Sequence, residues 1–218
     1  KLPERWVLTP GDLKFYVRPT GFKHTGLFPE QAVNWQFMQE QIRKAGKRPM
    51  VLNLFAYTGG ATVACAAAGA HVTHVDAAKG MTQWAKENRD LSGVPEDRTR
   101  FIVEDVKAFV AREIRRGNRY DGILMDPPSY GRGPGGEVWK LEDELYGLAE
   151  LCAQALSDEP VFFLINGYTT GFAAGVLGNV AQRCMKGRGR TVAEELALPV
   201  TTGGVLPCGA TARWTPDV

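Results

Sequence analysis

Residues 50–60, MVLNLFAYTGG, constrain the fold more than any other part of the chain. Residues 50–55 are a short, mostly apolar run without helical periodicity, which predicts a central strand covered on both faces. Asn53 is the one polar interruption of this run. The Gly-Gly pair that follows predicts a tight turn, and the small residues at 61–68 predict a helix that packs closely on a sheet.

A second apolar strand is predicted at residues 71–76, and it ends at Asp76. Asp76 comes 21 residues after Phe55 (76 − 55 = 21). In nucleotide-binding α/β units an acidic residue at about this spacing accepts hydrogen bonds from ribose hydroxyls. Strand, glycine turn, helix, strand and terminal acid therefore predict one nucleotide-binding half of an open α/β sheet.

Strands and helices alternate along the rest of the chain. Further strands are predicted at residues 99–104, 120–125, 161–165, 191–198 and 210–214, and helices at 29–45, 78–92, 106–116, 141–157 and 172–185. Strands separated by helices of this length are joined by right-handed crossovers and lie parallel. The pattern predicts an α/β, Rossmann-like doubly wound, mostly parallel seven-stranded sheet with an antiparallel C-terminal strand.

The first 20 residues have a different pattern. Apolar residues on both sides of the Pro10-Gly11-Asp12 turn predict a β-hairpin. We therefore expect an N-terminal β-hairpin over residues 1–20 and one α/β domain over residues 21–218. Because the chain begins with Lys1, we expect it to be a fragment, with the hairpin as a remnant of a missing N-terminal domain.

Composition excludes few classes of protein. The chain has 26 basic and 24 acidic residues, a balance that neither requires nor excludes nucleic acid. No signal peptide and no apolar run long enough to cross a membrane is present, so we expect a cytoplasmic protein without a membrane partner. We expect no metal site, since the cysteines are far apart and His71 and His74 point to opposite faces of a strand. The cysteines are Cys65, Cys152, Cys184 and Cys208.

Ligands of open α/β sheets bind at the carboxyl ends of the strands. Four predicted strand ends carry residues that suit a ligand, and their succession is a much stronger indication than any one alone. They are Phe55, Ala56, Tyr57, Thr58 and Gly59 after the first strand, Asp76 and Ala77 after the second, Asp105 and Val106 after the third, and Asp126, Pro127, Pro128 and Tyr130 after the fourth.

The glycine turn distinguishes between cofactors. A dinucleotide site requires G-x-G-x-x-G, whose amides hold a pyrophosphate. The segment FAYTGGAT lacks this spacing and has no Lys or Arg nearby. A ligand with adenosine and no phosphate fits better, and S-adenosylmethionine is the candidate. Asp105 followed by Val106 suits an adenine amino group and ring face.

The segments TGLFPEQ, NLFAYTGG, VDAAKG, EDV, DPPSYGRG and LPCGATARW give the chain a family resemblance. It resembles the class I S-adenosylmethionine-dependent methyltransferases, and most of all the bacterial group that includes large-subunit ribosomal RNA methyltransferases acting on cytosine C5 and guanine N7. The resemblance implies that residues 55–59 line the cofactor, Asp76 holds its ribose, and Asp105 and Val106 frame its adenine. It further implies that residues 126–130 face the reacting methyl group, and that Phe28 and Gln31 belong to a lid near the cofactor.

One departure from this group bears on the target atom. Methylation of a pyrimidine carbon needs a thiolate nucleophile, and residues 163–168, FLINGY, contain no cysteine. We expect Cys65 and Cys152 to lie in the core, which disfavours carbon methylation. The DPPSY segment is similar to the D/N-P-P-Y/F loop of amino-methylating enzymes. There a carboxylate and a proline-fixed carbonyl accept hydrogen bonds from the target amine and the aromatic ring stacks on the base, although Tyr130 comes one residue late for that pattern.

The sequence thus favours direct methylation of a nitrogen on a ribosomal RNA base. A small-molecule or protein methyltransferase and a non-catalytic nucleotide-binding module are the alternatives, and the target atom and oligomeric state stay open. The loop at residues 131–136 is a candidate substrate gate. Two basic clusters could follow RNA phosphates but more often such clusters are solvated faces. They are Arg112, Arg115, Arg116 and Arg119, and Lys186, Arg188 and Arg190.

Overall fold

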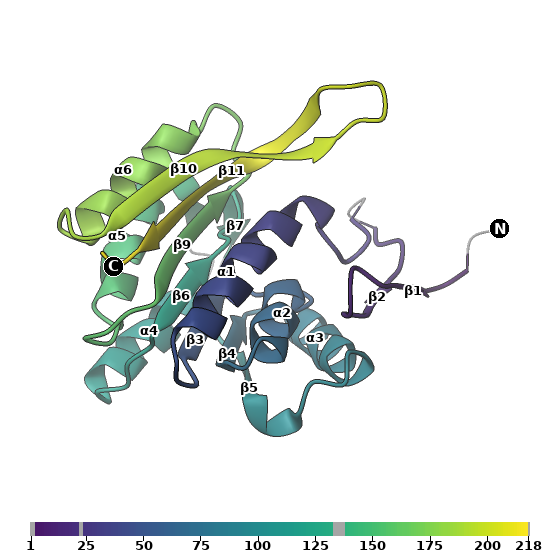
Figure 1. Ribbon diagram of the computed structural model, residues 1–218, viewed down its shortest axis with the longest axis horizontal. Coiled ribbons are helices and arrows are strands. Elements are labelled where there is room, and N and C mark those ends of the chain that lie inside the picture. Colours follow the sequence, from purple (N-terminus) through teal and green to yellow (C-terminus); the bar gives the residue numbers. More distant parts are fainter. Residues whose placement is uncertain (1–2, 22–23, 133–137, 218) are drawn as a thin grey trace. The chain divides into compact units, whose positions relative to one another are not determined.

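The computed structural model describes residues 3–21, 24–132 and 138–217. The chain divides into two compact units, one up to Glu104 and one from Asp105 onward. The boundary falls just after the strand Thr99–Val103, and each unit has its own strands and helices (Figure 1).

The first unit contains three parallel strands joined by helices. The strands are β3 (Met50–Leu54), β4 (His71–Asp76) and β5 (Thr99–Val103), and the helices are α1 (Ala32–Lys44), α2 (Gly60–Ala67) and α3 (Lys79–Leu91), with short 3-10 helices η1 (Pro29–Gln31) and η2 (Glu96–Arg98). β4 lies between β3 and β5, in the register Met50↔His71 and Val72↔Thr99. The predicted helix at 29–45 begins as η1 before α1, and the other predicted elements match within a few residues.

The polar interruption in β3 has a partner inside the unit. Asn53 Nδ2 donates to Thr62 Oγ1 of α2 at 2.8 Å, and Thr62 Oγ1 lies 2.9 Å from His74 Nδ1 of β4. All three side chains are buried, and burial lowers the pKa of His74 to about 3, so the imidazole is neutral. This short chain of hydrogen bonds joins β3, α2 and β4.

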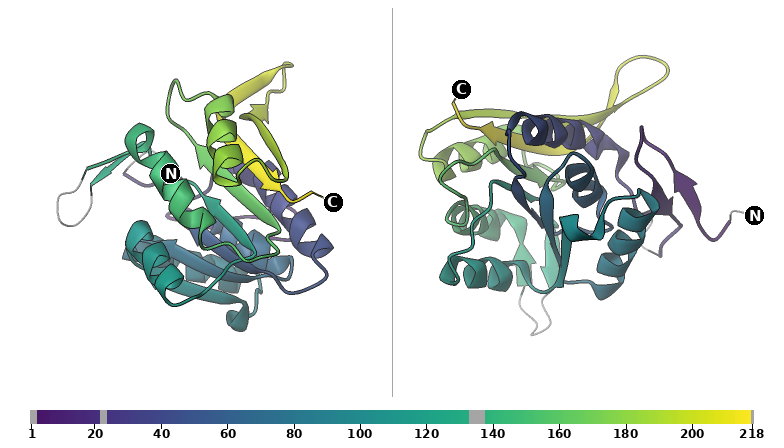
Figure 2. Two further views of the ribbon diagram at one scale, coloured as in Figure 1. Left: turned by 90° about the vertical axis from the view of Figure 1, so that its left-hand side faces the viewer. Right: turned by 60° about the horizontal axis from the view of Figure 1, so that its bottom comes forward.

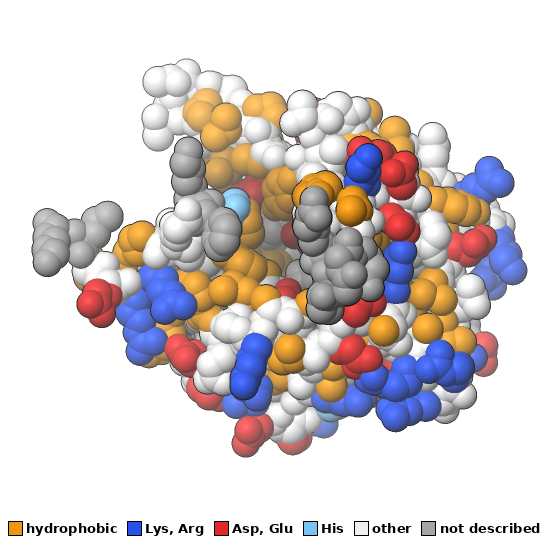
Figure 3. Space-filling view, turned by 180° about the vertical axis from the view of Figure 1, so that it is seen from behind, with side chains coloured by type: hydrophobic (Ala, Val, Ile, Leu, Met, Phe, Trp, Pro, Cys, Tyr) orange, Lys and Arg blue, Asp and Glu red, His pale blue; other side chains and the backbone are white. Residues whose placement is uncertain are grey.

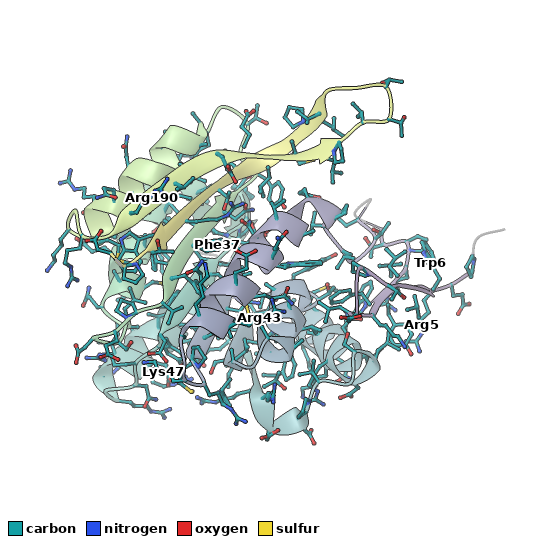
Figure 4. The ribbon with its side chains drawn as sticks, in the orientation of Figure 1. Arg5, Trp6, Phe37, Arg43, Lys47 and Arg190 are labelled. Atoms are coloured by element: carbon teal, nitrogen blue, oxygen red, sulfur yellow. The ribbon has the colours of Figure 1, made fainter. Side chains whose placement is uncertain are left out.

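The predicted N-terminal hairpin is confirmed as β1 (Trp6–Leu8) paired antiparallel with β2 (Phe15–Val17). It is bonded to α3: Trp84 Nε1 donates to the Tyr16 carbonyl at 2.9 Å, and Asn88 Oδ1 accepts from Tyr16 N at 2.8 Å. Arg5 pairs with Glu87 at 3.1 Å; Figure 4 shows Arg5 and Trp6 on this segment. The hairpin is therefore an integral part of the first unit.

The second unit contains a four-stranded sheet in the order β6-β9-β11-β10. The strands are β6 (Gly122–Met125), β9 (Phe162–Gly167), β10 (Arg190–Pro199) and β11 (Val205–Thr215), and the helices are α4 (Val106–Arg115), α5 (Leu141–Ala153) and α6 (Ala174–Cys184). β6 and β9 are parallel, whereas β11 is antiparallel to both β9 and β10. Figure 1 shows α6 lying along β10 and β11.

These seven strands confirm the predicted fold class, a mostly parallel α/β sheet with an antiparallel C-terminal end. One local prediction is wrong in part, since Gly131 and Arg132, the first two residues of the loop predicted at 131–136, belong to a strand. β7 (Tyr130–Arg132) pairs antiparallel with β8 (Val138–Lys140) in a short separate ribbon (Figure 2). The glycines and prolines concealed the β-forming Tyr130, Val138 and Trp139. The predicted gate at 131–136 lies outside the described residues except for its first two positions.

Within the described part of the chain, no helix has the length and apolar character needed to cross a membrane.

Candidate functional site

The loop after β3 has an unusual backbone. Phe55 and Tyr57 have positive φ angles of 55° and 50°, a region that residues with a side chain rarely adopt. Gly59 follows with φ 84°, and a Cβ there would lie 2.8 Å from the Ala85 Cβ. Such strain persists only where the surroundings hold it, and it concentrates at ligand sites. At Gly59 the missing Cβ lets the loop pack closely on Ala85 of α3, and the strain at Phe55 and Tyr57 is of the kind that ligand sites hold.

Thr58 fixes this loop from within. Its side chain is 1% exposed, and its hydroxyl donates to the Gly26 carbonyl. Its own carbonyl accepts a 2.8 Å bond from Asn88 Nδ2 of α3. Thr58, predicted to line the cofactor, is thus engaged in holding the loop against α3 and the segment that contains Gly26.

Asp76 ends β4 with both carboxylate oxygens bound by backbone amides. Oδ2 accepts from Tyr57 N and Oδ1 from Ala78 N, each at 2.8 Å. Burial raises the pKa of Asp76, and these two amide bonds oppose that rise. A carboxylate offers about four lone-pair positions, so two amide donors leave acceptor capacity for hydroxyl groups of a ligand.

Aromatic side chains lie against this carboxylate loop. The rings of Phe28 and Tyr57 are 5.6 Å apart between centroids, and His24 lies 5.4 Å from Phe28 on the other side. Burial raises the pKa of Tyr57, and the nearby charge of Asp76 raises it further, so the phenol stays protonated. The structure therefore brings together Phe28 of the predicted lid, Tyr57 and Asp76.

The positions of the remaining predicted cofactor residues do not by themselves indicate a ligand. Gln31 ends η1 and accepts a 2.8 Å bond from Asn34 Nδ2, while Ala56 is buried and Ala77 is exposed. In the second unit the Asp105 side chain caps α4, accepting from Ala108 N at 2.9 Å. Val106 is 3% exposed. Helix capping gives Asp105 a structural role beside the predicted adenine contact.

Asp126 follows β6 and is held by a side chain from the neighbouring strand. Its Oδ1 accepts a 2.8 Å hydrogen bond from Asn166 Nδ2 near the end of β9. A second bond joins the same two segments, because Thr169 Oγ1 donates to Ser129 Oγ at 2.7 Å. The Asp-Pro-Pro-Ser segment is thus fastened to β9 at two points.

The two prolines of this segment differ. Pro128 is exposed and its carbonyl accepts a 2.6 Å bond from Trp139 Nε1 of β8. Pro127 is buried, and within the described residues no hydrogen bond to its carbonyl is present. The Pro127 carbonyl is therefore the better candidate for accepting a bond from a substrate amine.

Tyr130 begins β7 and is 53% exposed, with its backbone opposite Lys140 of β8. The Lys107 ammonium lies 5.4 Å from the centroid of the Trp139 ring and pairs with Glu144 of α5. The ribbon of β7 and β8 therefore presents an exposed aromatic ring next to the Asp-Pro-Pro-Ser segment, with a cation packed on its second aromatic residue.

Sequence reasoning missed the partner of Asp126. From the sequence, Asn166 counts only as one of residues 163–168, which contain no cysteine. Its signal was a polar side chain in the otherwise apolar run FFLI, the same kind of signal that Asn53 gives in β3. The bond from Trp139 to the Pro128 carbonyl was missed as well, because no spacing rule connects residues in different strands of an unpredicted ribbon.

Three of the thiols are not activated as nucleophiles. Cys65 and Cys152 have no exposed surface, and burial raises the pKa of both well above the usual range. Burial, with the charge of Glu150, raises the pKa of Cys184 to about 11. Both predictions of buried core cysteines are confirmed. Among the described residues, no three His, Cys, Asp or Glu side chains form a group that could hold a metal ion.

The chain is similar to known methyltransferases. Residues 2–151 match a family model described as "S-adenosylmethionine-dependent methyltransferase". A crystal structure of an S-adenosylmethionine-dependent methyltransferase from Agrobacterium tumefaciens is 39% identical, with a TM-score of 0.94 over 100% of this chain and 72% of that one. A methyltransferase solved with S-adenosylhomocysteine shares the fold at 22% identity and a TM-score of 0.77, over 97% of this chain and 57% of that one.

Among curated relatives, ribosomal RNA large subunit methyltransferase K of Neisseria meningitidis is 36% identical over 131 residues. That match covers 60% of this chain and 36% of the relative. The match spans from 14% to 36% of the length of such curated relatives.

Proposed function

The chain belongs to the S-adenosylmethionine-dependent methyltransferase family, and we propose that it methylates a nitrogen of a ribosomal RNA base in the cytoplasm. When bound, S-adenosylmethionine supplies an electrophilic methyl group that the base nitrogen takes by direct displacement, which releases S-adenosylhomocysteine and a proton. The protein's task in such a transfer is to hold both partners in line.

The residues of the first unit suit this cofactor. Asp76 would accept hydrogen bonds from the ribose hydroxyls, with its carboxylate already oriented by Tyr57 N and Ala78 N. The strained loop at 55–59 lets backbone approach the ligand closely, and Phe28 and Tyr57 provide apolar ring surface. The loop carries no basic side chain for a pyrophosphate, which argues against a dinucleotide.

The observation that carries the proposed reaction is the Asp126–Asn166 pair at the end of β6. An ionised carboxylate accepts hydrogen bonds only, so it suits an acceptor that carries N–H groups. The carbonyl of Pro127, the residue after Asp126, offers a second acceptor. Because burial raises the pKa of the Cys65 and Cys152 thiols, neither provides an activated thiolate, and the chemistry of the site favours nitrogen over a pyrimidine carbon.

RNA as the substrate class is supported by the relatives and by the surface of the second unit. The Neisseria relative is named for ribosomal RNA, and Tyr130 offers an exposed ring on which a base could stack. Arg115, Arg116 and Arg119 are exposed near the end of α4, and Figure 3 shows Lys and Arg side chains gathered at that edge of the molecule. Cations at such an edge could contact phosphates.

The test is transfer of labelled methyl groups from S-adenosylmethionine to ribosomal RNA isolated from cells that lack this protein. We expect label in a base that elutes as an N-methylated nucleoside after nuclease digestion. Small amines and total protein, offered separately, test the alternatives of a small-molecule or protein acceptor. Label in either of these and none in RNA would overturn the proposed substrate class.

A further inference from the structure

Asn166 occupies a position that joins two strands of the second unit. β9 lies between β6 and β11, and the backbone of Asn166 is paired with Thr211 of β11. Its side chain is 1% exposed and reaches Asp126 after β6. It is thus a buried polar residue whose side-chain amide donates to the carboxylate proposed to receive the substrate amine.

The orientation of the Asn166 amide follows from this bond. An ionised carboxylate cannot donate, so the NH2 group of the amide must face Asp126. Asn166 Oδ1 is then left buried, and within the described residues it has no hydrogen-bond partner. An unsatisfied buried acceptor costs about 1–3 kcal/mol. Other buried polar atoms share this feature, His74 Nε2 among them, so the case for a role rests on the bond that the amide makes to Asp126.

We propose that Asn166 is a positioning residue for methyl transfer. By donating to Oδ1, Asn166 fixes the plane and rotamer of the Asp126 carboxylate. The carboxylate then has a single orientation in which to accept a hydrogen bond from the N–H of the substrate amine. This inference rests on the proposed function. Thr169 and Ser129 tie the same two segments together without touching the carboxylate, which separates fastening the loop from orienting the acid.

A substitution that should make the activity depend on pH tests this role. In Asn166→Asp a second carboxylate would lie within hydrogen-bond distance of Asp126, and two such groups share a proton with a raised pKa. At acid pH the protonated side chain at 166 donates an O–H to Asp126 and replaces the lost N–H. As the pH rises through the pKa of the shared proton, this donor is lost and two negative charges repel.

Every titratable group other than residue 166 is common to all variants. On neighbouring elements of the second unit these groups include Tyr130 of β7, Tyr168 after β9 and Cys208 of β11, and Lys107 of α4 pairs with Glu144 of α5. A change of pH profile between wild type and Asn166→Asp therefore reports on position 166.

The experiment measures kcat and KM against pH for wild type, Asn166→Ala, Asn166→Asp and Thr169→Val, with ribosomal RNA as substrate. Calorimetry with S-adenosylhomocysteine and thermal unfolding check that each variant is folded. We expect Asn166→Ala to lower kcat by about 100-fold, as misplacement of a reacting group does. Asn166→Asp should keep most activity at acid pH and lose it as pH rises, whereas Thr169→Val should lose less and keep the wild-type profile.

The Asn166→Asp comparison is made within one variant, so it does not depend on how well Asn166→Ala folds. A wild-type pH profile for folded Asn166→Asp, or a normal kcat for Asn166→Ala, overturns the role of Asn166 and leaves the proposed function standing. Failure of the wild type to methylate any acceptor overturns the proposed function itself.

Discussion

Two aspartates follow parallel strands in this chain, and they are held in opposite ways. Asp76, in the first unit, is bound by the backbone amides of Tyr57 and Ala78. Asp126, in the second unit, is bound by the side chain of Asn166, 40 residues further along the chain. A carboxylate held by the backbone keeps its orientation when nearby side chains change, whereas one held by a side chain loses it through a single substitution.

The difference matches the proposed division of labour. A cofactor common to a whole family needs an acceptor that survives sequence change, and backbone amides provide it. An acceptor for one substrate is more easily altered when a side chain holds it. Substitutions at Asp76 should therefore change mainly the affinity for the cofactor, and substitutions at Asp126 mainly the rate of methyl transfer.

The largest effect is expected from Asp126→Ala. Removing the carboxylate that receives the substrate amine should lower kcat by roughly 100- to 1,000-fold, the loss seen when one preorganised polar group is removed from an active site. Affinity for S-adenosylhomocysteine should change by less than about threefold, since this carboxylate acts on the acceptor. A loss of cofactor affinity as large as the loss of rate would contradict the assignment of Asp126 to the acceptor and Asp76 to the cofactor.

Asp76→Ala should act on the cofactor instead. Loss of charge-assisted bonds to two hydroxyls should raise the Kd for S-adenosylhomocysteine by about 10- to 100-fold, measured by calorimetry. Asp76→Asn is the matched control, because its amide keeps one acceptor oxygen and should lose less affinity. Unchanged affinity in Asp76→Ala would contradict its assignment to the ribose.

The pH dependence of cofactor binding follows from the raised pKa of Asp76. Because the ionised form receives the hydroxyls, affinity should fall, by up to about tenfold per pH unit, as the pH drops through this raised pKa. The sign for stability is the reverse, since a raised folded pKa means that the native state holds the proton more tightly. The free energy of unfolding contributed by this group therefore falls as pH rises from the usual aspartate pKa to the raised one. Calorimetry of S-adenosylhomocysteine binding across the acid pH range, on wild type and Asp76→Asn, checks the predicted fall in affinity. A parallel fall in both proteins would mean that a group other than Asp76 causes it.

The smallest change expected is in stability, from Gly59→Ala. Positive φ with a side chain costs about 1–2 kcal/mol, and the approach to Ala85 adds to it. Gly93→Ala is the control, since Gly93 has φ 66° and a Cβ there would meet nothing within 4 Å. Chemical denaturation should show a larger loss for Gly59→Ala, and equal losses would mean that Ala85 moves aside.

What the sequence predicted reflects how local each feature is. The strand, turn and helix around Gly59 and the acid at Asp76 follow one another within 27 residues (76 − 50 + 1 = 27), so periodicity and spacing disclose them. The Asp126–Asn166 bond depends on which strands become neighbours, and a single sequence does not contain that information. Positive φ at Phe55 and Tyr57 was equally hidden, because neither residue type favours it.

The ribbon of β7 and β8 shows a second limit of pattern reading. Its strands are three residues each, shorter than the runs from which alternation can be recognised. The glycines and prolines between them indicate a loop, which hides the short strands on either side. The sequence nevertheless marks Tyr130 as a candidate for substrate contact, since an aromatic residue next to a predicted site is informative without an element assignment.

The most direct test of the central claim is identification of the methylated atom. Ribosomal RNA from cells lacking the protein would be incubated with labelled S-adenosylmethionine and either wild type or Asp126→Ala, digested to nucleosides and analysed by mass spectrometry. The account predicts one N-methylated nucleoside with wild type, reduced at least about 100-fold with Asp126→Ala. A methyl group on a pyrimidine carbon, or equal labelling by both proteins, would contradict it.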